Sequence, residues 1–156
     1  MPKTPKPKEA WRAKSWYSIV APKIFGQSEI GETPTDEPNK LIGRTVECTL
    51  KDLTGDFTKH HIKLLFQINK VDGTMAFTKF IGHTLARDYI RSQVRRGSSR
   101  VDAIVDVITK DGYKLRIKGL AFTAHRANTS QEDSIRVTML DVIKKVASEK
   151  NFEQLI

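Results

Sequence analysis

Five arginines fall within a short stretch of this chain, and the first three recur at intervals of four residues. They are Arg87, Arg91, Arg95, Arg96 and Arg100, with Asp88 as the one acid between residues 85 and 100. A guanidinium presents a planar fork of donors that binds a phosphate bidentately, which a lysine cannot do. The four-residue spacing predicts a helical row of phosphate contacts. A merely solvated helix face is the alternative, but such a face would intersperse its signs.

A second group of cations lies at the N-terminus, where Glu9 is the one acid. Its members are Lys3, Lys6, Lys8, Arg12 and Lys14. The many prolines and the scarcity of apolar residues predict a disordered basic arm over residues 1–14, an uninvolved solvated terminus being the alternative. Trp11, Trp16 and Tyr17 offer faces on which unpaired bases could stack, although core packing competes for at least one of them.

The distribution of charge narrows the class of partner. The formal net charge is +9, and the two cationic groups carry most of it, which leaves the remaining body close to neutral. Such concentration is typical of contact with a polyanion, most often a nucleic acid. No apolar stretch approaches the ~20 residues of a membrane span, and no secretory apolar region is present. With the single Cys48, we expect a soluble protein of a reducing compartment, without a membrane partner.

The groups that could support catalysis or hold a metal are few. His60 and His61 are adjacent in a predicted strand, so they should point to opposite faces and cannot share a metal. Cys48 alternates with apolar residues and is expected to be a buried, inert thiol. Asp102 and Asp106 share a strand face without a third carboxylate. We therefore expect no enzyme activity, metal, cofactor or small-molecule substrate. The rival enzyme hypothesis requires His60 and the two aspartates to cluster in a concavity with perturbed pKa values.

Hydrophobic periodicity predicts the elements that would position these groups. Strands are expected over residues 16–21 (an edge strand), 45–50, 58–71 and 74–81, with a hairpin at Asp72-Gly73, a turn at 54–56 and a loop over 26–40. Thr84 is the expected N-cap of a helix over 85–96 that buries Ala86, Ile90 and Val94. A second helix is expected over 134–150, after a loop at 126–133.

A second hairpin, over residues 101–123, carries further cations. A three-residue loop at 110–112 with Gly112 in the left-handed conformation pairs residue 107 with 115 and 105 with 117. This register places both apolar sets on one side and Asp106 opposite Arg116 on the other. The outer face then holds Lys114, Arg116 and Lys118, a patch that Asp106 weakens. Arg126, beside His125 in the next loop, is a further candidate for phosphate contact.

An ordered set of residues resembles a known family. It comprises Trp16-Tyr17, Ala21-Pro22, Phe25, Gly43-Arg44, Val46-Glu47, Leu50 to Leu53, Phe80, Gly82, Leu85, Arg87-Asp88, Asp106-Val107, Thr109, Asp111 to Tyr113, Leu115-Arg116, Gly119, Phe122-Thr123 and Arg126. Together these resemble the small-subunit ribosomal protein S-one family of archaea and eukaryotes, formerly S-three-A. The lysine-rich, Pro-containing start is similar to an archaeal member.

The resemblance implies an α+β fold, with an antiparallel β-barrel-like core, two or three appended helices and the disordered basic arm. It implies a single rRNA-binding domain over residues 15–156, whose C-terminal helical part is truncated relative to family members. It also implies a cytoplasmic, ribosome-bound, non-catalytic protein on the small-subunit platform near the mRNA exit. Expected partners are small-subunit rRNA and neighbouring ribosomal proteins, with mRNA contact left open. The alternative function is a free single-stranded RNA-binding translation regulator.

Overall fold

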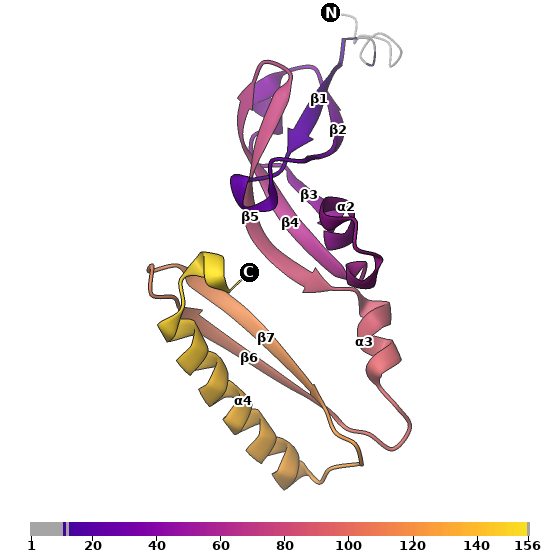
Figure 1. Ribbon diagram of the computed structural model, residues 1–156, viewed down its shortest axis with the longest axis vertical. Helices are drawn as coiled ribbons and strands as arrows, with labels where there is room; N and C mark the ends of the chain where they lie inside the picture. The colour runs from indigo at the N-terminus through magenta and orange to yellow at the C-terminus, as the bar shows by residue number, and fades with distance from the viewer. Residues whose placement is uncertain (1–10, 12, 156) are drawn as a thin grey trace, which may run out of the picture. The chain divides into compact units, whose positions relative to one another are not determined.

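The chain was analysed as a computed structural model, which describes residue 11 and residues 13–155. It divides into two compact units, with the division between Tyr89 and Ile90 (Figure 1). Most of the predicted arm, including Lys3, Lys6, Lys8 and Arg12, lies outside the described residues. That residues 15–156 fold as a single domain stays a prediction, and each unit is described by itself.

The first unit is built on a five-stranded sheet. Its strands are β1 (Ser15–Val20), β2 (Glu29–Thr35), β3 (Thr45–Thr49), β4 (Ile62–Asp72) and β5 (Met75–Leu85). Their order is β2-β1-β5-β4-β3, with β1 and β5 parallel and all other neighbours antiparallel. The fold is α+β as expected, but the sheet is open, with β2 and β3 as its edges. The barrel-like closure that the resemblance implied is therefore not found.

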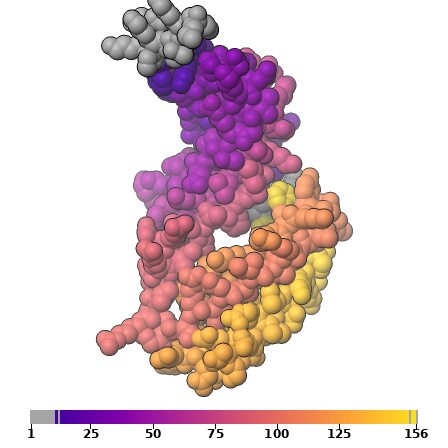
Figure 2. Space-filling view, turned by 180° about the vertical axis from the view of Figure 1, so that it is seen from behind, coloured from indigo at the N-terminus to yellow at the C-terminus, as the bar shows by residue number. Residues whose placement is uncertain are grey.

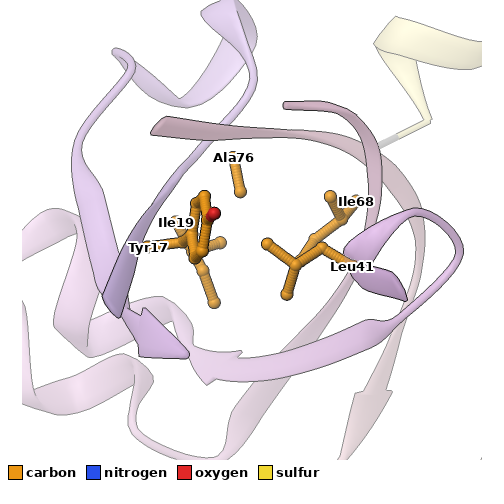
Figure 3. Close-up of a cluster of buried hydrophobic side chains, with 5 residues drawn as sticks. All are labelled: Tyr17, Ile19, Leu41, Ile68 and Ala76. Carbon is orange, nitrogen blue, oxygen red and sulfur yellow. The ribbon is translucent and has the colours of Figure 1, made fainter. Parts of the chain in front are cut away.

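A cluster of apolar side chains fills one end of the first unit. Figure 3 shows Tyr17 and Ile19 of β1 facing Leu41 and Ile68, with Ala76 of β5 completing the cluster. Leu41 comes from a 3-10 helix, η2 (Pro38–Leu41), and is fully buried. A second cluster joins Phe66 of β4 to the rings of Phe25 and Phe80, whose centroids lie 5.4 and 5.9 Å from that of Phe66.

The N-terminal half of this sheet differs from the prediction in two ways. β1 is flanked by β2 and β5, so it is an interior strand and not the expected edge strand. The segment 26–40, expected as a loop, contains β2 and η2. Pro34 lies within β2 opposite Trp16. An edge strand tolerates proline because one side of its backbone has no strand to bond.

The β3–β4–β5 part of the sheet largely confirms the prediction. Strands occur where the alternation placed them, and Asp72 pairs with Met75 across the expected turn. β4 begins later than predicted, because α2 (Leu50–Thr54) and the 3-10 helix η3 (Phe57–Lys59) occupy the preceding segment. Thr49 caps α2 by accepting from the backbone N–H of Asp52 at 3.3 Å, and Gly55 ends it with a φ of +72°. A third 3-10 helix is η1 (Lys23–Phe25).

The second unit is a β-hairpin with a long helix against it. Its elements are β6 (Arg100–Ile108), β7 (Lys114–Phe122), α4 (Thr129–Glu149) and η4 (Phe152–Gln154). The predicted register is confirmed, with Val107 opposite Leu115 and Gly112 at a φ of +81°. Figure 2 shows the helix, in yellow, lying along the hairpin, in orange, and α4 contacts chiefly β6. α4 begins five residues before the predicted start at 134. Asn128 is its N-cap, and the N–H of Asn128 donates to the side-chain oxygen of Gln131 at 3.0 Å.

Candidate nucleic-acid interface

The helix α3 (Arg87–Gln93) and the turn after it carry four of the predicted arginines. The start of α3 is fixed by Ala86, whose N–H donates to the carbonyl of His61 at 2.8 Å. The ring of Tyr89 stacks on that of His61, with centroids 3.9 Å apart and an interplanar angle of 17°. The cationic segment therefore starts from an anchored first turn.

The predicted helix over residues 85–96 is too long at both ends. Thr84 and Leu85 belong to β5, where they pair with Lys63 and Ile62, so Thr84 is not an N-cap. The predicted burial of Ala86, Ile90 and Val94 is also wrong, since the first two are half-buried and Val94 is exposed. Strand pairing with β4 prevailed over local helix propensity.

Arg95 and Arg96 lie in a turn beyond the helix. Ser98 closes this turn, because its hydroxyl and its N–H donate to the carbonyl of Arg95 at 2.7 and 3.1 Å. The Ser98 hydroxyl also accepts from the N–H of Arg95 at 3.1 Å, and Gly97 adopts a φ of +82°. The four-residue recurrence thus continues in sequence but not in one helix, and only Arg87 and Arg91 lie on α3.

The predicted arginines differ in whether a carboxylate already binds them. The side chains of Arg87, Arg91, Arg95 and Arg96 are exposed, and none has an ion pair within the described part of the chain. Arg100 instead donates two hydrogen bonds to the carboxylate of Asp102, at 2.7 and 2.5 Å. Free guanidinium groups offer their full charge to phosphate, whereas the charge of Arg100 is already neutralised by Asp102.

The outer face of the β6–β7 hairpin carries the predicted second patch. Arg116 donates two bonds to Asp106, at 2.7 and 2.8 Å, so the expected neutralisation is confirmed. Lys114 and Lys118 flank this pair on β7 and lie opposite Ile108 and Ile104. Those two isoleucines are 61% and 58% exposed, which makes this face a mixed apolar and cationic surface. It is a weaker site for phosphate than the segment 87–96.

The loop that carries Arg126 is hydrogen-bonded to the segment that follows the arginines. The N–H of Thr123 donates to the carbonyl of Ser99 at 2.9 Å, and that of Ala127 donates to the Ser99 hydroxyl at 3.1 Å. Arg126 is exposed. The structure therefore ties two predicted cationic loops of the second unit together. Sequence reasoning missed this link, although Ser99 and Thr123 lie just outside a hairpin whose register could be extended by one pair.

Two described residues extend the cationic and aromatic surface near the arm. The ammonium of Lys14 lies 4.8 Å from the centroid of the Trp11 ring. Trp16 is exposed, whereas Tyr17 is buried in the core, as the competing prediction for one of these aromatics anticipated. Trp11 and Trp16 therefore remain available for stacking.

The groups that the rival enzyme hypothesis requires have partners within their own units. The pKa values of Asp102 and Asp106 are lowered because Arg100 and Arg116 donate to them. His60 and His61 lie in a turn before β4, not in the strand as predicted, and their rings meet edge to face at 5.8 Å. Burial raises the pKa of the Cys48 thiol to about 11.

The described residues offer neither a metal-ligand cluster nor a membrane-spanning helix. Within residues 13–155 and residue 11, no three His, Cys, Asp or Glu side chains gather in a way that could hold a metal ion. Of the helices the structure describes, none is both long and apolar enough to cross a membrane.

Comparison with known proteins gives a consistent family. The model of the Ribosomal S3Ae family matches residues 3–156. The small ribosomal subunit protein eS1 of Methanopyrus kandleri is 54% identical over 149 residues, covering 96% of this chain and 71% of that protein. The proteins of the same name from Methanothermobacter thermautotrophicus and Desulfurococcus amylolyticus are 50% and 52% identical, each over 96% of this chain and over 76% and 70% of their own lengths. The resemblance drawn from the residues is confirmed, and this chain belongs to the Ribosomal S3Ae family.

Proposed function

We propose that this chain is a structural constituent of the small ribosomal subunit that supports translation by binding rRNA. One observation carries the proposal: Arg87, Arg91, Arg95 and Arg96 are exposed and lack a carboxylate partner within the described residues. Exposed arginines without acids are suited to phosphate, because each neutralised phosphate releases condensed counterions. The relatives named as small ribosomal subunit proteins are consistent with this role.

The finer placement follows the family resemblance. The chain sits on the platform of the small subunit near the mRNA exit, in the cytoplasm, beside other ribosomal proteins. The arm threads along rRNA through Lys3, Lys6, Lys8, Arg12 and Lys14, while Arg126 extends the contact of the segment 87–96. Arg100, Lys114, Arg116 and Lys118 contribute less. Two of these four are ion-paired, and each of the two lysines lies opposite an exposed isoleucine of β6.

A matched pair of variants tests the proposal. Arg91→Gln/Arg95→Gln/Arg96→Gln removes three free cations, and Lys40→Gln/Lys63→Gln/Lys70→Gln removes three whose ammonium groups lie 2.8 to 3.7 Å from carboxylates. Both variants lower the formal net charge of +9 by the same amount. The arginine variant should be depleted from the small-subunit peak of a sucrose gradient, whereas the lysine variant should remain there.

The gradient also separates the two candidate functions. Co-sedimentation with small subunits supports a structural constituent, and crosslinks mapped to rRNA in that peak identify the RNA. A free single-stranded RNA-binding regulator would instead place the unaltered chain away from subunits. Equal incorporation of the two variants would refute the role of the arginines.

A further inference from the structure

Phe57 is an unusually exposed aromatic residue of the first unit. Its side chain is 73% exposed, the highest value among the large apolar residues that the structure describes. It lies in η3 between α2 and β4 of the first unit, with polar neighbours in sequence on both sides. A phenyl ring left in water gives up the stabilisation that burial would supply.

The backbone holds this ring on a rigid turn. The carboxylate of Asp56 accepts from the N–H and the hydroxyl of Thr58, at 3.0 and 2.7 Å. A ring nitrogen of His60, Nδ1, lies 3.0 Å from the carbonyl of Phe57. Gly55, with a φ of +72°, ends the preceding helix directly before the turn. The backbone that carries the ring is therefore held by hydrogen bonds, which lowers the entropy lost when a ligand binds this turn.

One cation lies over the ring. The ammonium of Lys51 is 4.1 Å from the ring centroid, within range of a cation–π contact. The large exposed fraction of Phe57 leaves much of the ring accessible to a planar group. Of the nearby acids, Asp52 accepts from Thr49 and also feels the charge of Lys51, and Asp56 caps η3 while lying 3.7 Å from Lys59. Lys51 has no ion pair among the described residues, so its ammonium can serve a phosphate beside a stacked base.

We propose that Phe57 and Lys51 form a stacking site for one unpaired RNA base. Aromatic side chains that take bases on their faces, next to cations that take the backbone, are the recurrent chemistry of single-stranded RNA recognition. The inference rests on the proposed function, because it takes RNA to be the ligand. It adds a second kind of contact: the free arginines bind phosphates of any RNA, whereas Phe57 selects RNA with an unstacked base.

The test uses the full chain and two RNA hairpins, one with a single bulged 2-aminopurine and one fully paired. Phe57→Ala should weaken binding of the bulged hairpin by roughly 5- to 150-fold, the range for loss of one base–aromatic stack. Its affinity for the paired hairpin and its melting temperature should not change. Quenching of the 2-aminopurine on binding should be lost with Phe57→Ala and kept with Phe57→Trp. The matched control is Ile42→Ala, which removes an apolar side chain that is also exposed but carries no cation over it.

The outcomes distinguish this inference from the proposed function. The variant Arg91→Gln/Arg95→Gln/Arg96→Gln should weaken binding of both hairpins alike. No effect of this variant would refute the phosphate role while leaving the stacking result intact. If Phe57→Ala and the unaltered chain bind the bulged hairpin with equal affinity, the stacking site is refuted. A variant that keeps bulge binding but loses association with small subunits would show that Phe57 docks on protein, and would overturn it too.

Discussion

The difference between free and ion-paired arginines should be measurable as a salt dependence. Arg91→Gln/Arg95→Gln should lower the slope of log affinity for rRNA against log salt by about 1.4–1.8, because each neutralised phosphate contributes roughly 0.7–0.9. Neither of these two guanidinium groups has a carboxylate partner among the described residues. The magnitude therefore follows from counting free cations.

The matched control removes the same number of arginines together with their carboxylates. In Arg100→Gln/Asp102→Asn/Arg116→Gln/Asp106→Asn, both lost arginines are held by pairs of bonds between 2.5 and 2.8 Å. The charge of each guanidinium is already neutralised by its carboxylate, so removing both members of each pair should leave the slope close to that of the unaltered chain. The net charge also stays at +9.

The assay is a fluorescence-anisotropy titration of a labelled small-subunit rRNA fragment with the full chain. Between about 50 and about 200 mM salt, a slope difference of about 1.6 corresponds to a difference of about tenfold in the loss of affinity. A titration resolves such a factor easily. Equal slopes for the two variants would refute the claim that ion pairing decides which arginines bind phosphate.

Three further predictions concern the fold. Phe66→Ala should lower the free energy of unfolding by about 3–5 kcal/mol in a denaturant titration, because the Phe66 ring is wholly buried. Phe57→Ala should change the free energy of unfolding by less than about 0.5 kcal/mol, because Phe57 is exposed. Equal losses of stability in the two variants would contradict the burial of Phe66 and the exposure of Phe57. The Cys48 thiol has its pKa raised from 9.0 to about 11, so its thiolate is about 100-fold rarer when folded at neutral pH. Because a thiolate of higher pKa is also more nucleophilic, its reaction with a disulfide reagent should accelerate by at least about tenfold in denaturant. A fast reaction of the folded chain would contradict the burial. A Cβ at Gly119 would lie 3.0 Å from Cδ1 of Ile143, so Gly119→Val should cost about 1–3 kcal/mol of stability on melting; an unchanged melting temperature would show that α4 packs more loosely on β7.

Local chemistry explains what could be predicted of the fold. The hairpin of β6 and β7 follows from period-two alternation around a loop with Gly112, and its register was obtained residue by residue. A turn residue that needs positive φ and a one-sided apolar pattern leave a single register. The pairing of Asp106 with Arg116 came with that register.

Non-local pairing explains what could not be predicted. The parallel pairing of Ile19 with Ala76 joins residues far apart in sequence. No residue pattern in either segment indicates which strand it pairs with. It is this pairing, with β2 on its other side, that makes β1 interior. The helix expected from 85 begins later for the same kind of reason, since Leu85 pairs with Ile62 of β4.

The sequence predicts which residues form the candidate site, but not which of their charges are free to bind phosphate. The pattern indicates five arginines without distinguishing those that form ion pairs from those that do not. Arg100 and Asp102 are two residues apart on one strand, so their side chains share a face. The alternation of the strand is therefore enough to predict their ion pair. Phe57 gave no periodic signal, because its exposure depends on the short elements α2 and η3 around it.

The arginine segment gains its order from its neighbours rather than from a core of its own. α3 has seven residues and none of them is buried, and isolated helices of this length are marginal in water. Its first turn is held by the stack of Tyr89 on His61, and the turn after it is closed by Ser98. Between these two points the side chains of Arg91 and Arg95 are exposed, so they can adjust to the phosphates of a folded RNA. Phe57 differs, because hydrogen bonds on both sides hold the backbone of its turn. A stacking face on the first unit should add affinity for RNA with an unpaired base, which phosphate contacts alone do not distinguish from duplex of the same charge.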